Sequence, residues 1–199
     1  VLVSDVPFVS KNERNIIEKQ TQSEGMDGFQ FTERQSDGKL VPASARENYY
    51  PVYFLEPLSG NEAAIGFDLG SNTTRLAALK RASQSGEISA TARIKLVQET
   101  KDQYGLLLIA PIFEVNSPQQ LLNPKSSGEL LGFTTGVYRI DNMINSSLEQ
   151  FSKSGSNSQV SIFDLTAPSG SRRLYPSSEQ ESNNDYSFNR LTDIIDVGG

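Results

Sequence analysis

The chain has 199 residues, of which 36% are hydrophobic and 21% charged, and its formal net charge is −6. This composition is typical of one globular domain or two small ones, and the acidic balance argues against nucleic acid or an anionic membrane surface as a partner. The sequence has no Cys, His or Trp, which excludes disulfide bonds, thiolate or imidazole catalysis, and ordinary zinc or haem ligation within the chain. We therefore predict no cofactor, and only metals with oxygen ligands stay open.

The N-terminal region is predicted to be helical. Val3, Val6, Val9 and Ile16 recur at loosely helical spacing with charged residues between them, so we expect an amphipathic helix that ends before Gly25. No run of about 18 apolar residues occurs in the sequence, so no segment is predicted to span a bilayer. Since the chain begins within an apolar pattern and ends directly after an apolar run, we expect it to be a piece of a longer protein.

Downstream of residue 25, strand-like runs alternate with polar loops. One helix is predicted to start at Ser71 or Asn72, whose side chains can cap it, and to end at Gly86. The other predicted elements are strands at 28–33, 49–56, 63–69, 94–98, 105–113 and 132–140, and a helix at 142–151. Because few strands are joined by crossover helices, an α+β fold with antiparallel sheets is favoured. A Ser/Gly/Asn-rich break at 152–158 suggests an internal boundary.

A series of short motifs in a fixed order carries a resemblance to a known family. The motifs are Val6-Pro7-Phe8-Val9, Tyr50-Pro51-Val52-Tyr53, Asn61 to Leu69, Arg75 with the run 76–82, Gly105 to Phe113, Gly132-Phe133 and Gly136-Val137. In number, order and spacing they resemble the CHASE family, the cyclase- and histidine-kinase-associated sensory extracellular domains. The likeness covers roughly Val6 to Leu148, which is most of the chain.

This resemblance implies an architecture and a cellular setting. It implies a long N-terminal stalk helix (1–25), a membrane-distal PAS-like ligand-binding lobe (26–135) and a membrane-proximal PAS-like lobe (136–199) that is incomplete. It also implies a homodimer that pairs along the N-terminal helix. The chain would be the extracytoplasmic, periplasmic or extracellular, part of an inner or plasma membrane receptor. It would have no catalytic activity of its own and would relay ligand binding to a cytoplasmic histidine kinase or nucleotide cyclase.

The resemblance also implies a ligand site in the distal lobe. In plant members the ligand is the adenine derivative cytokinin, and Asp68 is similar to the Asp that hydrogen-bonds the purine edge. The other residues expected to line the pocket are Phe67, Thr91, Leu96, Val97, Ile109, Phe113 and Thr134. Ile109 stands where a small polar residue would hold adenine, so we expect a different amphipathic small molecule. The alternative for Asp68 is that its side chain caps the next helix through Gly70 and Ser71.

Two other functions stay open from the sequence. The stretch from Phe67 to Arg75 resembles the first phosphate loop of exopolyphosphatase-type, actin-like ATPases, and the stretch from Ile195 to Gly199 resembles the second. Against this, more than sixty residues precede Asp68, and the residues after it are predicted to form a helix where that fold has a β-hairpin. The second alternative is a structural or dimerisation module whose pocket is filled by side chains.

Overall fold

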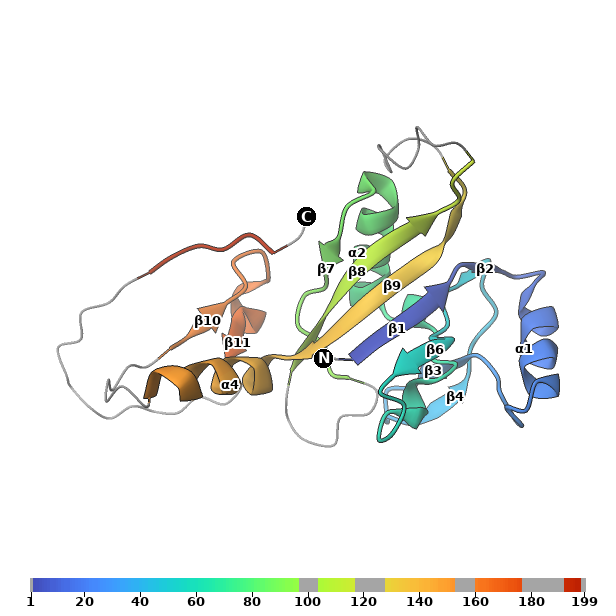
Figure 1. Ribbon diagram of the computed structural model, residues 1–199, viewed down its shortest axis with the longest axis horizontal. Helices are drawn as coiled ribbons and strands as arrows, with labels where there is room; N and C mark the ends of the chain where they lie inside the picture. Colours follow the sequence, from blue (N-terminus) through green and yellow to red (C-terminus); the bar gives the residue numbers. More distant parts are fainter. Residues whose placement is uncertain (1, 97–103, 117–127, 153–159, 177–191, 198–199) are drawn as a thin grey trace.

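The computed structural model describes residues 2–96, 104–116, 128–152, 160–176 and 192–197. Its centre is a five-stranded sheet in the order β6-β1-β9-β8-β7, in which every neighbouring pair is antiparallel (Figure 1). The strands of this sheet are β1 (Leu2–Pro7), β6 (Phe54–Glu56), β7 (Ser89–Ala90), β8 (Gly105–Phe113) and β9 (Leu130–Arg139). The remaining strands form two-stranded pairs: β2 (Val9–Ser10) with β5 (Asn48–Tyr49), β3 (Thr32–Arg34) with β4 (Leu40–Pro42), and β10 (Ile162–Phe163) with β11 (Arg173–Tyr175).

The helices lie in three different places around the sheet (Figure 1). Helix α2 (Thr73–Ser85) packs on β7 and β8, whereas α1 (Arg14–Ser23) lies at one end of the molecule. Helix α4 (Ile140–Ser152) follows β9 directly and leads away from the sheet towards β11 at the other end. Short 3₁₀ turns complete the described elements: Glu62–Ala64, Leu69–Ser71 and Ser169–Ser171.

The N-terminal segment corrects the predicted architecture. The described residues contain no long N-terminal helix: Leu2 to Pro7 form strand β1, which pairs with β9 on one side and β6 on the other. The prediction of a long stalk helix followed by two tandem PAS-like lobes is therefore wrong. The sheet-rich α+β class with antiparallel sheets is what the structure has. The segment boundaries at residues 25/26 and 135/136 stay predictions.

The physical reason for this error is a double periodicity. Val3 and Val6 fit a helical spacing, but Leu2, Ser4 and Val6 alternate with exposed residues at the period of a strand. Those three side chains are buried, while Val3 is 46% exposed. The β-branched residue Val6 directly before Pro7 also suits a strand better than a helix. The homodimer was predicted to pair along this helix, which the described residues do not form. The homodimer itself stays a prediction.

Elements with strong local signals lie where the sequence predicts them. The side chain of Asn72 caps α2 by accepting a hydrogen bond from the Arg75 amide (3.1 Å), and Gly86 ends this helix with a φ of 70°. The predicted strand 105–113 coincides with β8. The predicted strand 63–69 is wrong, because 3₁₀ turns lie at both of its ends. Between them, Phe67 and Asp68 form only isolated bridges, with Thr32 and Pro51.

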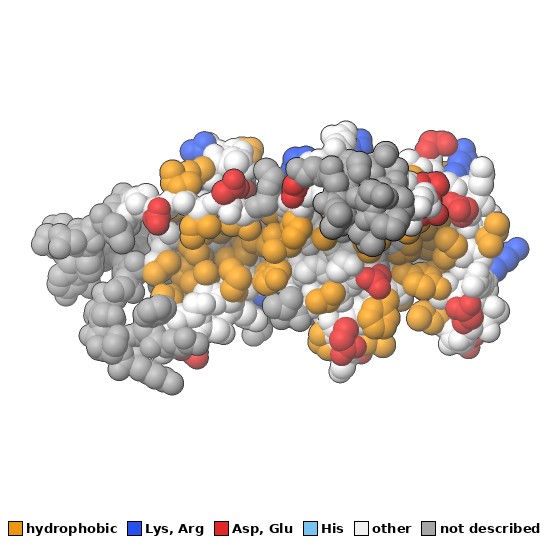
Figure 2. All heavy atoms as spheres, turned by 45° about the horizontal axis from the view of Figure 1, so that its top comes forward, with side chains coloured by type: hydrophobic (Ala, Val, Ile, Leu, Met, Phe, Trp, Pro, Cys, Tyr) orange, Lys and Arg blue, Asp and Glu red, His pale blue; other side chains and the backbone are white. Residues whose placement is uncertain are grey.

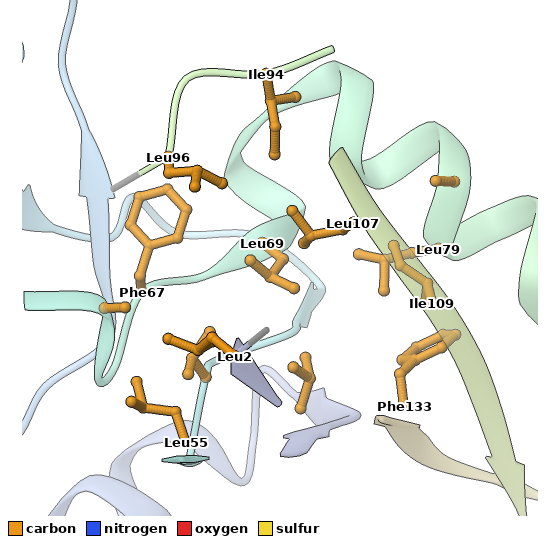
Figure 3. Close-up of a cluster of buried hydrophobic side chains, with 14 of the residues drawn as sticks. Leu2, Leu55, Phe67, Leu69, Leu79, Ile94, Leu96, Leu107, Ile109 and Phe133 are labelled. Carbon is orange, nitrogen blue, oxygen red and sulfur yellow. The ribbon is translucent and has the colours of Figure 1, made fainter. Parts of the chain in front are cut away.

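The main core fills the space between the inner face of the sheet, defined as the face that packs on α2, and the segment from Val52 to Leu69. Figure 3 shows Phe67 beside Leu96 at one end of this cluster, and Ile109 with Phe133 at the other. A second, smaller cluster lies beneath α1 and contains Val9, Phe29, Phe31, Ala43 and Tyr49. The main core therefore places α2 and the Phe67 segment over the sheet, which is where a cavity lies.

The C-terminal end of the molecule is packed differently. Among its described residues, Ile140 and Ala167 are the buried hydrophobic ones, whereas Leu165 is 58% and Ile195 81% exposed. Figure 2 shows hydrophobic side chains gathered in a band along one face, part of it at the end that carries α4, β10 and β11. None of the described helices combines the length and the apolar character needed to cross a membrane.

Candidate functional site

A cavity of about 30 Å³ lies between the inner face of the sheet and the segment that carries Phe67 and α2. Most of its wall is apolar, and it is formed by Leu2, Val52, Ala64, Phe67, Leu69, Leu96, Leu107 and Val137. Three polar side chains complete the wall: Ser4, Arg75 and Thr135. Since a water molecule needs about 10–15 Å³ of such space, the cavity has room for two or three heavy atoms. An apolar cavity with a few polar groups is typical of a small-molecule site.

The pairing of β1 with β9 places the two hydroxyls. Ser4 lies opposite Thr135 in the register. Both side chains point to the inner face, because their chain neighbours Val3 and Thr134 lie on the outer face. The two hydroxyl oxygens lie 2.7 Å apart, so one donates to the other, and both residues are buried. The cavity floor thus contains a hydrogen-bonded pair of hydroxyls beside the apolar side chains of Leu2 and Leu107.

The face of α2 that packs on the sheet carries the third polar group. Arg75, Ala78, Leu79 and Ala82 follow the i, i+3, i+4, i+7 spacing of one helical face, and all four are buried. Arg75 is therefore a cation at a position where this face otherwise has apolar residues. Its side chain is only 5% exposed.

The guanidinium of Arg75 has few partners. Its Nη2 donates to the backbone oxygen of Lys95 (2.9 Å), and its Cζ lies 5.3 Å from the centre of the Phe67 ring. Its Nε is buried without a hydrogen-bond partner, and no described Asp or Glu forms an ion pair with it. Burial, and to a smaller extent the charge of Arg34, lowers the pKa of Arg75 to about 10, which still leaves the group protonated at neutral pH.

Asp68 is the best-satisfied charged group in the neighbourhood. It is fully buried, and its Oδ1 accepts hydrogen bonds from the backbone amides of Tyr50 (2.8 Å) and Gly70 (2.9 Å). Its Oδ2 pairs with a guanidinium nitrogen of Arg46, whose other terminal nitrogen pairs with Glu33. We call Asp68, Arg46 and Glu33 the carboxylate–arginine cluster. This cluster joins the Phe67 segment to β3 and to the loop that precedes β5, and it leaves Asp68 with partners on both of its oxygens.

The predicted pocket residues are only partly brought together. Phe67 and Leu96 line the cavity, and Asp68 does not. Ile109 is fully buried in the core, and Thr91 accepts a hydrogen bond from the Leu107 amide (3.0 Å), so these two lie on the inner side without lining the cavity.

The other predicted residues lie elsewhere. Thr134 is on the outer face of the sheet, where its hydroxyl donates to Asp5 (3.3 Å), and Phe113 is at the end of β8. Val97 lies outside the described residues. A ligand role for Asp68 and for the other predicted residues stays a prediction, while the capping alternative for Asp68 matches its bond to the Gly70 amide.

Sequence analysis missed the polar residues of the cavity. A signal for Arg75 was present, since a lone Arg begins the apolar face of a predicted helix. Thr135 was missed in favour of its neighbour Thr134 because only the strand register decides which of the two points inward. Ser4 was missed because the N-terminal residues, which form strand β1, were interpreted as a helix.

Two further features bear on alternative sites. An open depression of about 240 Å³ lies beside Phe29 and Ile65, with Asp27 and Glu62 at its border. Within the described part of the chain, no group of Asp and Glu residues is arranged to hold a metal ion. Helix α2 follows Asp68 where a phosphate loop of the actin-like type needs a β-hairpin, and the Asp68 carboxylate is directed at backbone amides and Arg46.

Comparisons with known proteins identify the type of domain. A family model described as "CHASE domain" matches residues 3–175. Among curated proteins, the chain is 27% identical over 155 residues to hybrid signal transduction histidine kinase A of Dictyostelium discoideum. The match covers 75% of this chain but 7% of that protein, so the chain corresponds to a small part of the relative's length.

Proposed function

The chain belongs to the CHASE domain family, and from this premise we propose that it binds a small molecule in the cavity between the sheet and α2. A CHASE domain is a sensory module of signalling receptors, so the chain is a sensor domain and the ligand site is the part that needs an assignment. The observation that carries this proposal is the cavity with polar groups on opposite walls, Ser4 and Thr135 from the sheet and Arg75 from α2.

The proposed setting follows from the family and the relative. The domain lies on the extracytoplasmic side of a membrane receptor, and its output is a histidine kinase, as the name of the Dictyostelium relative suggests, or a nucleotide cyclase. The chain itself is not an enzyme in this proposal. Ligand binding produces a signal only if the ligand contacts differ between two states of the receptor, and a cavity wall built from separate elements, β1, β9 and α2, allows this.

The test combines a ligand screen with a matched pair of variants. Purified 199-residue chain is screened with a metabolite library by thermal unfolding, because a ligand that binds only the folded state raises its melting temperature. Leu107→Phe fills the cavity, whereas Leu108→Phe adds the same side chain to the outer face of the same strand. A ligand of the cavity should stabilise the parent and Leu108→Phe but not Leu107→Phe.

Other results would contradict the proposal. A ligand that stabilises both variants equally binds elsewhere, and the depression beside Phe29 would be the next candidate site. If no library member and no co-purified molecule in native mass spectra binds the parent, the cavity is a packing defect and the domain is a structural or dimerisation module. Thr135→Val, a milder change in the same wall, replaces Leu107→Phe if the latter does not fold.

A further inference from the structure

The side chain of Arg75 is a buried cation without a counter-ion among the described residues. It is 5% exposed, forms no ion pair with a described carboxylate, and keeps its Nε without a hydrogen-bond partner. Burying an unpaired charge is unfavourable, and proteins usually pair such groups or place them where a ligand pairs them. The Phe67 ring, 5.3 Å away, and the Lys95 carbonyl, 2.9 Å away, supply only part of what a counter-ion would supply.

The cavity that Arg75 lines indicates the chemical class of its missing counter-ion. We propose that Arg75 binds the carboxylate group of a small organic acid inside this cavity. This inference rests on the proposed function, namely that the cavity is the ligand site, and it adds the chemical class of the ligand. An Arg guanidinium has a planar fork of N–H donors that matches a carboxylate, and a charge-assisted pair of this kind is strongest away from water.

The size of the cavity selects a carboxylate among the anions. Its volume of about 30 Å³ has room for two or three heavy atoms, which matches the three atoms of a carboxylate. A phosphate group has five heavy atoms and is too large for the space as it stands. The Ser4–Thr135 hydroxyl pair provides a donor on the opposite wall for the second oxygen.

The experiment compares an acid with its matched amide at constant ionic strength. Formate is the probe, formamide is its neutral counterpart with the same three heavy atoms, and inorganic phosphate tests the size limit. At about ten times the dissociation constant, formate should raise the melting temperature of the 199-residue chain by roughly 3–6 °C. Formamide and phosphate should leave it unchanged.

Two arginine variants locate the effect. Arg75→Met keeps an unbranched side chain but removes the charge, and it should abolish the shift. Arg81→Met is the matched control, because Arg81 lies on the same helix, is exposed, and donates to Ser89 and Ala90 outside the cavity. The Arg81→Met protein should respond to formate as the parent does.

A second readout uses the parent protein and does not depend on the folding of a variant. The Nε–H group of Arg75 has no partner among the described residues, so its nitrogen-15 and proton resonances should move when formate binds. Arg75→Lys, which keeps the charge but loses the fork, assigns this signal and should weaken formate binding at least tenfold.

The possible negative results distinguish between two proposals: that the cavity is the ligand site, and that the ligand is a carboxylate. If formamide stabilises the parent as well as formate does and Arg75→Met still responds, the anion inference is wrong while the cavity remains the sensor site. If formate stabilises Arg75→Met and the parent equally, it binds elsewhere and the inference is again wrong. If neither formate nor any molecule of the library shifts the melting temperature or the Nε–H signal, both proposals fail.

Discussion

Two arginines contact adjacent residues of one segment, and their surroundings are opposite. Arg46 binds the carboxylates of Asp68 and Glu33, so charges of both signs meet and each group has its partners within the chain. Arg75 lies against the ring of Phe67, one residue away, and lines a cavity without any described carboxylate beside it.

This difference teaches how to separate structural from functional charges. Removing one partner of a buried charge that the chain satisfies completely is expected to destabilise the fold, whereas a buried charge that the chain leaves unsatisfied is available to a ligand. The residue type is a poorer guide than the number of partners. Asp68 has the chemistry of a ligand anchor but uses its oxygens for the fold, while Arg75 occupies a core position of a helix and keeps a free donor.

The largest effect should come from the carboxylate–arginine cluster. Asp68→Ala leaves the buried amides of Tyr50 and Gly70 without their acceptor and Arg46 without one partner, so we expect a loss of about 2–4 kcal/mol in the free energy of unfolding. Urea unfolding measures it. Asp37→Ala, which removes an exposed partner of Lys39, is the control and should change stability by less than about 0.5 kcal/mol.

The same variant tests the ligand role predicted for Asp68. If Asp68→Ala costs less than about 1 kcal/mol, the cluster is not the stabilising element that its geometry indicates. If the variant stays folded and loses its response to every ligand of the parent, Asp68 is the anchor after all. The site around Arg46 and Asp68 would then be the functional one, and the site around Arg75 the structural one.

Replacing Arg75, unlike replacing Asp68, is not expected to lower the free energy of unfolding. Arg75→Met removes a buried charge that has no counter-ion in the described part of the chain, so we expect the ligand-free protein to keep its stability or gain up to about 2 kcal/mol. Urea unfolding without any carboxylate buffer measures this. A loss above about 2 kcal/mol would mean that the charge has a strong partner and would contradict the contrast between the two sites.

How far the sequence predicts this fold depends on where the decisive interaction lies. Helix α2 is predictable because Asn72 and Gly86, its two end signals, are local, and β8 because residues 105–113 are apolar throughout. Strand β1 is not, since its seven-residue neighbourhood fits two periods. What decides between them is pairing with β9, more than 125 residues further along the chain, for example Ser4 with Thr135.

The candidate site was less predictable than the fold for a related reason. That Arg75 is buried follows from the helical face it shares with Ala78, Leu79 and Ala82. That no described carboxylate pairs with it cannot be seen in a local pattern, because a carboxylate from any distant element could have done so. Likewise, the partners of Asp68 come from Arg46 and the Tyr50 amide, which no spacing around residue 68 indicates.

Substitutions on the two faces of β9 should differ moderately in how much they lower the free energy of unfolding. Thr135→Val removes the hydroxyl that is hydrogen-bonded to Ser4 inside the core, so a loss of about 1 kcal/mol is expected. Thr134→Val is the matched control on the outer face, where the hydroxyl is exposed, and should change stability by less than about 0.5 kcal/mol. Equal losses in urea unfolding would show that the register of β9 is shifted by one residue.

The smallest effect should be the pH dependence of the carboxylate–arginine cluster. Burial acts to raise the pKa of Glu33, but hydrogen bonds from Ser44 and Arg46 outweigh it and hold this pKa below the ordinary value of 4.5. A carboxyl whose pKa is lowered by folding stabilises the protein above its unfolded pKa, and this contribution is lost as the pH falls through the folded value. The parent should therefore lose about 0.5 kcal/mol more than Glu33→Gln when urea unfolding is compared at pH 6 and pH 3.

Ser44→Ala, which keeps the carboxylate but removes one hydrogen bond, should remove part of that difference. Identical pH profiles in the parent and Glu33→Gln would show that the bond to Arg46 does not hold Glu33 in its charged form, and Asp68 would be the main carboxylate partner of Arg46.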